Sequence, residues 1–576
     1  MKNADLARMF EEIAAVMEII GESSFRILSY HRAARAMEEL PQQIEEVARD
    51  GKLMDIPGIG KSIAAKIDEY LQTGQMNAHK EMLARIPPSL AELLMLPGMG
   101  PKTAQRLWRQ AGVGSVQELE RVIENEPEKL TTIPGIGPKK IRQMWESLAF
   151  AKTAQGRTRL GEATMLSEEL LAQVRAIPGV QQAQAAGSLR RGKDTVGDID
   201  LLCQAPEEDA GRIIGEFVKL GPVRKVIAGG MKKGSVLLDR QVQADLRVVP
   251  GESYGSALAY FTGSKEHNVK LREIAVKKKM KLNEYGLFSG KRSVAGADEE
   301  GIYRHLGLQF VPPELRENRG EVEAAMLGQL PRLVELADIR GDLHMHTEAS
   351  DGTNTIDEMI QACVDRGYSY MAICEHSKAQ AHAGGLDEKQ ILAHANAIRT
   401  AARKHKGIRV FAGVEVDIFK DGSLDFDVAV LGELDFVVAS AHSALGMARG
   451  EATRRIIKAI ETPHVHCIGH PAGRVINSRP GMDLDMEAVA AAAAANNVAL
   501  EINSQHMRLD LRDIHARTAI EKGARLIIST DAHNISELDY IAYGVTTARR
   551  GWATAGDVLN TLTADEFLRW VTSRAG

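Results

Sequence analysis

The alternation of apolar and polar positions divides the chain into two kinds of region. Up to about residue 150 it predicts helices separated by short turns, beginning with an amphipathic helix directly after the N-terminal residues. After Phe150, strand-like apolar runs alternate with helices. We therefore predict a helical N-terminal region followed by domains that mix strands and helices.

One short unit recurs three times in the helical region. It reads Ile-Pro-Gly-Ile-Gly at residues 56–60, Leu-Pro-Gly-Met-Gly at 96–100 and Ile-Pro-Gly-Ile-Gly at 133–137. The glycines allow a tight turn with exposed N–H groups, and the next helix directs its positive end at the same place. Such a turn binds phosphate without reading bases. The units resemble the helix-hairpin-helix motif of DNA repair proteins, and the predicted DNA-binding residues are Gly58, Gly60, Gly98, Gly100, Gly135 and Gly137.

A group of carboxylates follows in the mixed region. A Gly187-Ser188 turn precedes a strand in which Asp198 and Asp200 alternate, so both project from one face. Asp245 lies in a second β-type run, from which it could join them. Three converging carboxylates repel one another unless divalent cations lie between them. This arrangement predicts nucleotidyl transfer with two Mg²⁺ or Mn²⁺ ions, in which Ser188 and Arg191 hold the triphosphate.

The segment at residues 260–272, Tyr-Phe-Thr-Gly-Ser-Lys-Glu-His-Asn-Val-Lys-Leu-Arg, resembles the sugar- and base-contacting segment of family X DNA polymerases, which include polymerase beta. The resemblance implies that the turn packs against the nucleotide sugar and that its tyrosine limits ribonucleotides. Asn268 would contact the incoming nucleotide and Arg272 the template strand. The implied nucleotide-binding residues are Gly187, Ser188, Arg191, Tyr260, Phe261, Gly263, Asn268 and Arg272.

The same resemblance reaches the N-terminus, where Lys66 falls at the Schiff-base lysine of the family's lyase domain. A lysine attacks an aldehyde only after it loses a proton, which requires burial or cationic neighbours. Ser62 stands where vertebrate members carry a further lysine, and Gln243 replaces an arginine often found two residues before the third aspartate. Lys66 is therefore a candidate lyase nucleophile, and a purely DNA-binding lysine is the alternative.

Histidines and carboxylates at the ends of apolar runs predict a second metal site beyond residue 339. Side chains at the C-terminal ends of parallel strands converge at one face of a β/α barrel, and imidazole with carboxylate suits Zn²⁺, Mn²⁺ or Fe²⁺. His470 follows an apolar run and precedes a proline. His464 and His466 lack this pattern and are left out. The candidate ligands are His344, His346, Asp351, His376, Glu415, His442, His470, Asp531 and His533.

This series resembles the PHP (polymerase and histidinol phosphatase) domain. The resemblance implies a first metal at His344, His346, Glu415 and Asp531, a second at Glu415, His442 and His470, and a third at Asp351, His376 and His533. It thus implies two to three ions, Mn²⁺ or Zn²⁺, and a Mn²⁺-dependent 3′-to-5′ exonuclease that also cuts abasic sites.

Composition and charge limit the number of domains, the location of the protein and the state of its cysteines. With 576 residues the chain needs three or four domains, and no apolar run approaches the roughly 20 residues that span a membrane. No apolar signal core follows the N-terminus, so the cytoplasm is the expected location. The four scattered cysteines predict buried thiols rather than disulfides. A net charge of −5 does not by itself indicate nucleic acid, but basic pairs cluster before residue 300.

The order of these units resembles the bacterial and archaeal PolX family. The predicted fold is multidomain α/β: helix-hairpin-helix regions, a nucleotidyltransferase α+β palm with a thumb, and a distorted β/α barrel of the PHP type. The predicted domains are a lyase-like domain (1–78), fingers (79–150), palm (151–250), thumb (251–317), a helical linker (318–338) and the PHP domain (339–576).

The resemblance implies a monomeric repair polymerase that fills short gaps in base-excision or related repair, with gapped or primer-template DNA and deoxynucleoside triphosphates as partners. Two alternatives stay open for the PHP domain. It could be a metal-stabilised scaffold without activity, or a phosphoesterase for small molecules.

Overall fold

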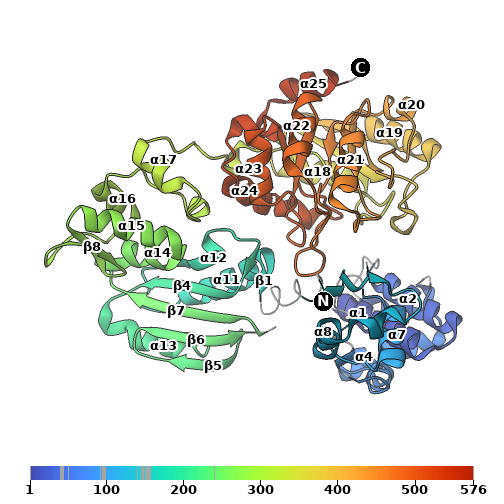
Figure 1. Cartoon of the computed structure of the whole chain (residues 1–576), viewed down its shortest axis with the longest axis horizontal. Coiled ribbons are helices and arrows are strands. Elements are labelled where there is room, and N and C mark those ends of the chain that lie inside the picture. The colour runs from blue at the N-terminus through green and yellow to red at the C-terminus, as the bar shows by residue number, and fades with distance from the viewer. Residues whose placement is uncertain are drawn as a thin grey trace. The chain divides into compact units, whose positions relative to one another are not determined.

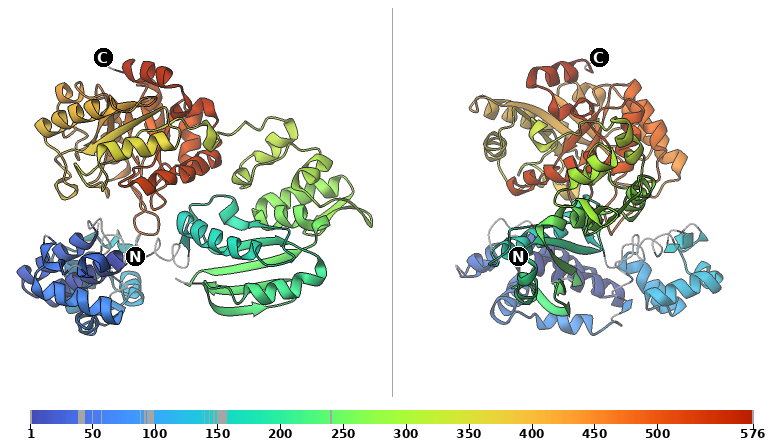
Figure 2. Two further views of the ribbon diagram at one scale, coloured as in Figure 1. Left: turned by 180° about the vertical axis from the view of Figure 1, so that it is seen from behind. Right: turned by 90° about the vertical axis from the view of Figure 1, so that its left-hand side faces the viewer.

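The computed structural model describes the chain except for residues 1, 39–43, 50, 57, 88, 91–92, 94–98, 139, 143, 146–147, 149–156, 239–240 and 575–576. The described chain forms two compact units, residues 1–155 with 477–479, and residues 156–476 with 480–576. Each is treated separately below (Figures 1 and 2). No described helix is both long and apolar enough to cross a membrane.

The first unit is helical, as the sequence predicts. Its core comes from the apolar faces of the helices, and Phe10, Ile13 and Met17 of the first helix are fully buried in it. Gly74 and Gly112 end their helices in the left-handed conformation that glycine adopts without strain. The described helices are α1 (Lys2–Ile20), α2 (Ser24–Glu38), α3 (Ile44–Arg49), α4 (Lys61–Thr73), α5 (Asn77–Leu83), α7 (Pro101–Ala111), α8 (Val116–Asn125) and α9 (Pro127–Thr131).

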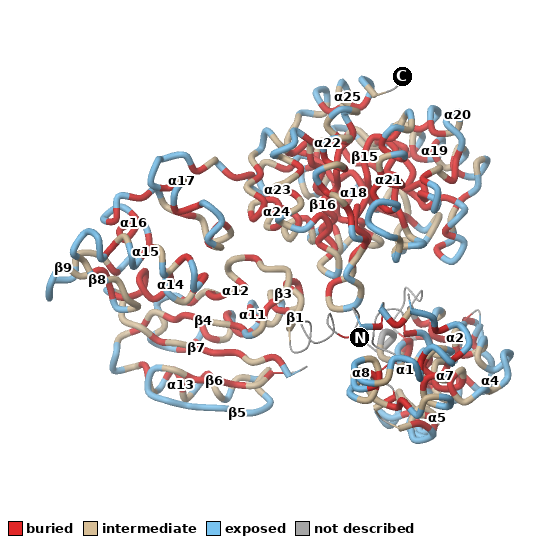
Figure 3. The backbone as a smooth tube through the Cα atoms, viewed as in Figure 1, coloured by how far each residue is buried: buried red, intermediate tan, exposed pale blue. Residues whose placement is uncertain are grey.

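The second unit begins with a five-stranded sheet in the order β2-β4-β7-β6-β5. Strands β4 and β7 run parallel, and the other pairs are antiparallel. Strand β5 is an exposed edge, while β4 and β7 lie in the middle of the sheet (Figure 3). The elements are α11 (Leu160–Arg175), β2 (Gln182–Ala185), α12 (Gly187–Arg190), β3 (Thr195–Val196), β4 (Asp198–Gln204), α13 (Ala210–Phe217), β5 (Val223–Gly229), β6 (Lys233–Leu238) and β7 (Gln243–Val249).

A smaller helical layer with a three-stranded sheet follows the palm-like sheet. It contains α14 (Tyr254–Thr262), α15 (Lys265–Lys277), β8 (Met280–Asn283), β9 (Gly286–Ser289), β10 (Arg292–Ala295) and α16 (Glu299–Leu306). Residues 318–338, the predicted helical linker, are helical only in part. Only α17 (Glu321–Leu327) and a short 3-10 turn (Leu336–Asp338) are helical there, because Gly328 ends α17 in the left-handed conformation.

The C-terminal domain is a barrel of seven parallel strands in chain order, β11 to β17. Strand β12 (Tyr370–His376) is buried at every position, as expected where helices cover a parallel sheet. An isolated parallel bridge between Met345 and Ala532 joins the segments that follow the first and last strands. The other strands are β11 (Gly341–Asp342), β13 (Arg409–Asp417), β14 (Phe436–Ser440), β15 (Cys467–Ile468), β16 (Ala499–Asn503) and β17 (Leu526–Ser529).

Helices surround the barrel, and the succession of domains agrees with the predicted multidomain α/β class. They are α18 (Ile356–Asp365), α19 (Glu388–Ala402), α20 (Val428–Leu431), α21 (Arg449–Ile460), α22 (Met486–Ala495), α23 (Asp513–Glu521), α24 (Ile541–Arg550) and α25 (Ala564–Thr572).

Candidate active sites

Strand pairing brings the three aspartates of the palm together. Strands β4 and β7 are parallel, with Asp200 opposite Asp245, and Asp198 lies two residues earlier on the same face as Asp200. Each aspartate offers an oxygen within 4.8 Å of the other two. Three carboxylate oxygens this close together could hold divalent cations, which prefer oxygen ligands.

The charges of this pocket are not balanced by the protein alone. Burial, followed by the charges of Asp198 and Asp245, raises the pKa of Asp200 to about 6. Lys233 on β6 lies 2.5 Å from Asp245 and supplies one positive charge. Burial opposes ionisation of Asp245, but hydrogen bonds from Lys233, Ser235 and Gln243 hold its pKa below the usual value. Lys233 was not singled out in the sequence analysis.

Asp200→Asn is expected to stabilise the metal-free protein at pH 8 by about 1–2 kcal/mol, because it removes a buried charge. The raised pKa means that the folded protein binds the Asp200 proton more tightly than the unfolded chain does. The unfavourable contribution is therefore full above pH about 6 and disappears below the unfolded value of 3.8. Thermal unfolding in EDTA at pH 8 and pH 4 measures it. An equal advantage at both pH values would contradict this explanation.

The Gly187-Ser188 segment packs directly against the carboxylates. Gly187 has φ +61, and a Cβ there would collide with Asp200 Oδ2, so glycine is required. The predicted turn is a one-turn helix, α12, because the N–H of Arg191 bonds back to the Gly187 carbonyl. The side chain of Arg191 donates to Glu317 at 3.0 Å and to the Thr262 carbonyl.

The predicted sugar-contacting residues form the end of α14. Tyr260 is 38% exposed, and Phe261 stacks under the Arg247 guanidinium at 4.3 Å. Gly263 ends the helix with φ +71. Asn268 donates to the Tyr260 carbonyl at 2.7 Å, and Arg272 donates to the Asn268 carbonyl at 3.3 Å. These two hydrogen bonds connect the predicted nucleotide-binding residues Tyr260, Asn268 and Arg272 to one another.

The first and third Pro-Gly units have the same backbone geometry. Ile59 N–H bonds to the Ile56 carbonyl, and Ile136 N–H bonds to the Ile133 carbonyl, each at 3.0 Å. Gly58 and Gly135 have φ +89 and +83. The final glycine of each unit accepts the first hydrogen bonds of the next helix, as Gly60, Gly100 and Gly137 do. Gly98 lies outside the described residues.

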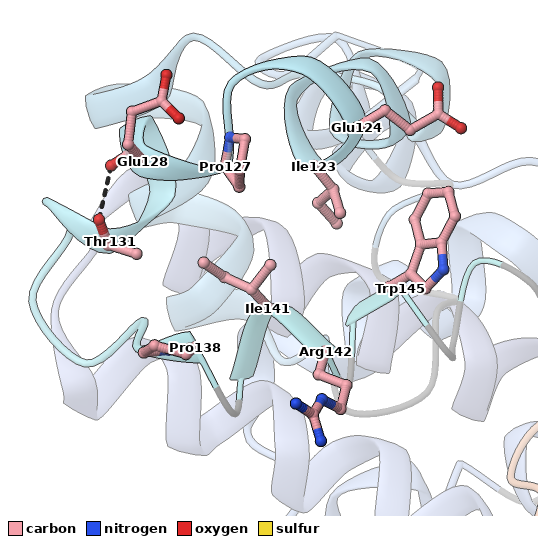
Figure 4. A pocket seen from close by; sticks show the side chains of 9 residues that line it. All are labelled: Ile123, Glu124, Pro127, Glu128, Thr131, Pro138, Ile141, Arg142 and Trp145. Carbon is pink, nitrogen blue, oxygen red and sulfur yellow. Dashed lines mark hydrogen bonds between the residues drawn. The ribbon is translucent and has the colours of Figure 1, made fainter.

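A cavity of about 570 Å³ borders the third unit (Figure 4). Pro138 and Ile141 of the unit's helix face Ile123 of α8 across it, and Trp145 closes one end. The helix that follows the third unit therefore lines an open groove with several apolar side chains.

The double change Gly135→Ala and Gly137→Ala is expected to weaken DNA binding by about tenfold for every sequence. The positive φ at Gly135 disfavours alanine, and backbone contacts to phosphate carry no base information. Fluorescence anisotropy with two duplexes of unrelated sequence measures this effect. Gly51→Ala is the control, since Gly51 also has positive φ but lies outside the units. A loss limited to one duplex would contradict the prediction.

Lys66 is half-buried on α4. Its ammonium donates to the Ser62 carbonyl at 3.0 Å and to the Ser62 hydroxyl at 2.9 Å, and lies 5.9 Å from the Tyr30 ring centre. Burial lowers its pKa, and Glu69 partly opposes this. The residue that replaces the expected second lysine is thus a hydrogen-bond acceptor of Lys66.

The nine predicted ligands of the barrel converge at the C-terminal ends of its strands. His376 ends β12, Glu415 lies in β13, His442 follows β14, and His470 follows β15. Backbone hydrogen bonds join the ligands near the start of the domain to those near its end. Asp531 N–H donates to the His344 carbonyl and His346 N–H to the Ala532 carbonyl, each at 2.9 Å. Barrel closure therefore brings residues nearly 190 positions apart into one site.

Ligand atoms within 4.8 Å of one another form three overlapping groups. Their membership differs from the sets implied by family resemblance: His346 also belongs with the third set, and His376 also lies beside Glu415, at 2.6 Å. His470 Nε2 lies 2.9 Å from Glu415. The groups are His344 with His346 and Asp531, His376 with Glu415 and His442, and His346 with Asp351, His376 and His533.

The donor set fits metal ions. His344 Nε2 and His346 Nδ1 are buried and have no hydrogen-bond partner among the described residues. Buried polar atoms without partners are unfavourable unless another group satisfies them. A cluster of imidazoles and carboxylates with free lone pairs suits Mn²⁺ or Zn²⁺.

In the barrel site, the carboxylates raise the pKa of neighbouring imidazoles, and the imidazoles lower the pKa of neighbouring carboxylates. Burial alone would lower the pKa of His376, but Glu415 and Asp351 raise it to about 10. Burial opposes ionisation of Glu415, yet His442, His376 and His344 hold its pKa well below the usual value. Without a cation, protons on the imidazoles would supply the balancing positive charge.

A layer behind the ligands was missed by sequence reasoning. Glu501 accepts from or shares a proton with His344 Nδ1 at 2.8 Å, and Asn503 donates to Asp531 at 2.9 Å. Such partners fix which imidazole nitrogen faces a metal. Arg508 lies 3.8 Å from Asp531. The available signal was two polar residues, at alternate positions, in the otherwise apolar strand β16.

Of the two histidines excluded from the site, His466 is buried and His464 is partly buried. His466 packs on Phe436, and burial lowers its pKa to about 4. The four cysteines are buried and free, as predicted.

Four family models match the chain. They are a helix-hairpin-helix domain (residues 1–76), a SAM-like helix-hairpin-helix tandem (90–149), the DNA polymerase beta thumb (257–317) and the PHP domain (342–505). A crystal structure titled Leishmania infantum polymerase beta, ternary P/T complex, is 22% identical and covers 40% of this chain and 98% of that chain, with a TM-score of 0.27. That score is too low to carry weight.

Curated relatives match over nearly the whole chain or over about a third of it. A probable phosphatase of Shewanella sp. (strain MR-4) is 32% identical over 202 residues, which is 33% of this chain and 75% of the phosphatase. The DNA polymerase/3′-5′ exonuclease PolX of Bacillus subtilis (strain 168) is 35% identical over 565 residues, 97% of both chains. With this full-length similarity and the polymerase beta thumb and PHP matches, the chain belongs to the PolX family, the family X DNA polymerases with a C-terminal PHP domain.

Proposed function

We propose that the chain is a DNA-directed DNA polymerase that fills short gaps during base-excision or related repair. The observation that carries this proposal is the convergence of Asp198, Asp200 and Asp245 within 4.8 Å, directly beside the Gly187 segment. The full-length similarity to a Bacillus subtilis DNA polymerase/3′-5′ exonuclease supports it. Gapped or primer-template DNA and deoxynucleoside triphosphates are the proposed partners, and the chain is proposed to act as a monomer.

The three aspartates would hold Mg²⁺ or Mn²⁺. When bound, two such ions would lower the pKa of the primer 3′-hydroxyl and neutralise charge on the triphosphate. The protein's own residues position the reactants. Ser188 and Arg191 orient the triphosphate, Tyr260 and Phe261 pack against the sugar, and the Gly-turn units hold DNA phosphates.

Primer extension on a one-nucleotide gap, with Mg²⁺ or Mn²⁺ and with or without nucleotides, tests both halves of the function. Elongation with nucleotides is expected from the palm, and shortening of the primer without nucleotides is expected from the barrel. Failure to elongate a gapped primer with either metal would reject the polymerase assignment.

Tyr260→Ala is expected to reduce discrimination against ribonucleotides by about tenfold or more, while deoxynucleotide turnover changes less. Tyr260 is partly exposed at the end of α14, and its removal opens space beside the sugar 2′-position. The ratio of kcat/KM for the two nucleotides measures this. Tyr285→Ala is the matched control, since Tyr285 is also exposed but lies on the β8–β9 turn. An unchanged ratio would assign the gate to another group.

We further propose that the barrel is a Mn²⁺-dependent 3′-to-5′ exonuclease that also cuts at abasic sites, with two to three Mn²⁺ or Zn²⁺ ions. The unpartnered nitrogens of His344 and His346 support metal binding there. When bound, the metals would lower the pKa of a coordinated water and polarise the phosphate. Glu501 and Asn503 would hold His344 and Asp531 in position for this task.

The similarity of about a third of the chain to probable phosphatases supports a second candidate, hydrolysis of small phosphate esters. Release of phosphate from histidinol phosphate, measured beside DNA degradation, separates the two. A complete ligand set argues against the third candidate, a scaffold without activity, because a scaffold would tolerate the loss of ligands.

We also propose lyase chemistry at Lys66. The lowered pKa of its ammonium favours the neutral amine that attacks an aldehyde. Trapping with borohydride on ring-opened abasic DNA reads out this activity. Lys66→Ala is the test variant, and Lys61→Ala, which changes an exposed lysine on the same helix, is its control.

A further inference from the structure

A cationic cavity of about 250 Å³ lies inside the second unit, between the palm and the barrel. On the palm side it is bounded by the loop from Gly192 to Thr195, which connects α12 to β3. On the barrel side it is bounded by Arg474, by the start of α23 and by the end of α24. Its walls carry six cations and two carboxylates: Arg157, Lys193, Arg319, Arg474, Arg512 and Arg550, with Asp194 and Asp513.

Only some of these cations form ion pairs with the carboxylates of the cavity wall. Arg474 pairs with Asp194 at 2.9 Å, and Asp513 accepts from both Arg319 and Arg550, at 2.9 and 2.8 Å. The guanidinium of Arg512 has no hydrogen-bond or ion-pair partner in the described part of the chain. The cavity therefore holds more positive than negative charge.

A buried donor points to a missing acceptor. Arg474 is 8% exposed, and its Nε has no hydrogen-bond partner within the described ranges. An unsatisfied N–H on a buried cation is unfavourable by more than a neutral one. An anion in the cavity would satisfy it, and guanidinium groups match phosphate oxygens in geometry.

The pKa values of two neighbouring side chains, His515 and Asp513, agree with a positive potential in the cavity. Burial, Arg512 and Arg474 lower the pKa of His515 to about 4. Burial opposes ionisation of Asp513, yet Arg550 and Arg319 lower its pKa to about 2. In addition, α23 begins at the cavity with Arg512 as its N-cap, so the positive end of a nine-residue helix adds to the field.

We propose that this cavity binds a phosphate-bearing anion that joins the palm to the barrel. Its volume lies below the roughly 300–1,000 Å³ of pockets for drug-sized ligands, and suits a small anion. Two sources share this chemistry: free pyrophosphate, which nucleotidyl transfer would release if the proposed function holds, and the terminal phosphate of a DNA strand.

The position of the cavity gives the anion a route to the polymerase site. Arg550 of the barrel donates to the backbone carbonyl of Arg191 at 2.6 Å and to Glu317 at 3.1 Å. Glu317 in turn accepts from the Arg191 side chain, which is predicted to hold the triphosphate. An anion that engages Arg550 would compete with these contacts and change how firmly Arg191 is held.

The test is calorimetric titration of the full-length protein in EDTA, where no divalent cation retains the anion at the palm or barrel sites. Sodium pyrophosphate, inorganic phosphate and a short single strand with or without a 5′-phosphate are the probes. The double variant Lys193→Ala and Arg512→Ala removes two cations outside both proposed active sites. Arg403→Ala, an exposed arginine on the barrel, is the matched control.

Pyrophosphate is expected to bind wild type and the Arg403 variant equally, and the double variant at least about tenfold more weakly. Preference for the phosphorylated strand, lost in the double variant, would assign the site to DNA ends. Equal affinities in all three proteins for every probe would overturn the proposal. Primer extension and degradation assays by the double variant, without added pyrophosphate, test the proposed function separately.

Discussion

Glu415→Ala is expected to abolish 3′-to-5′ degradation, to lower the bound metal content and to leave primer extension unchanged. Glu415 lies within 4 Å of imidazole nitrogens of His344, His346, His376, His442 and His470, so its loss disturbs every neighbouring ligand group. A carboxylate has two oxygens and can bridge two cations, whereas an imidazole offers one free nitrogen. The expected loss of degradation rate is about 10³-fold or more.

Metal content by elemental analysis and circular dichroism accompany the two activity assays, so that unfolding is not mistaken for loss of chemistry. Glu415→Gln keeps the side-chain volume and is the second variant if alanine unfolds the barrel. Glu433→Ala, an exposed glutamate of the same domain, is the control. If the folded Glu415 variant loses metal and still shortens primers normally, the nuclease lies elsewhere and the scaffold alternative is favoured.

Asp245→Ala is expected to produce the opposite separation. Nucleotide addition should fall by about 10³-fold or more, because a lost ligand removes charge stabilisation worth several kcal/mol in the transition state. Primer degradation should persist. Asp245 is the aspartate that Lys233 contacts and that pairs in register with Asp200, so its removal affects both the metal position and the charge balance.

Asp198→Ala should behave in the same way, and Glu208→Ala, an exposed glutamate of the palm, should have no effect. Single-nucleotide insertion on gapped DNA with Mg²⁺ and with Mn²⁺ measures all three variants. Extension by Asp198→Ala or Asp245→Ala at near the wild-type rate would reject the palm as the site of polymerisation.

Much of the fold follows from local sequence pattern. The alternation that places Asp198 and Asp200 on one face is a property of a single strand, and the strand-end positions of His376 and His442 follow from apolar runs. The Pro-Gly units are likewise local, and two of them have matching hydrogen bonds. Such features depend on neighbours in the chain, so a sequence specifies them directly.

The finer grouping of the site could not be predicted, because it depends on contacts between distant elements. Glu501 is found behind His344 only when β16 lies at the correct place in the barrel. Lys233 contacts Asp245 through antiparallel pairing of β6 with β7. Register between strands and closure of the barrel decide these contacts, and neither has a local signature in one sequence.

Closure of the barrel also sets the order in which this protein could mature on the ribosome. The first ligands, His344 and His346, emerge nearly 190 residues before Asp531 and His533, yet they are held by backbone bonds to the Asp531-Ala532 segment. The palm segment is translated earlier, but its hydrophobic core also contains Ile476 and Leu509 of the barrel domain. The barrel ligands are therefore brought together only near the end of translation, and the palm core is completed only after Leu509 has been made.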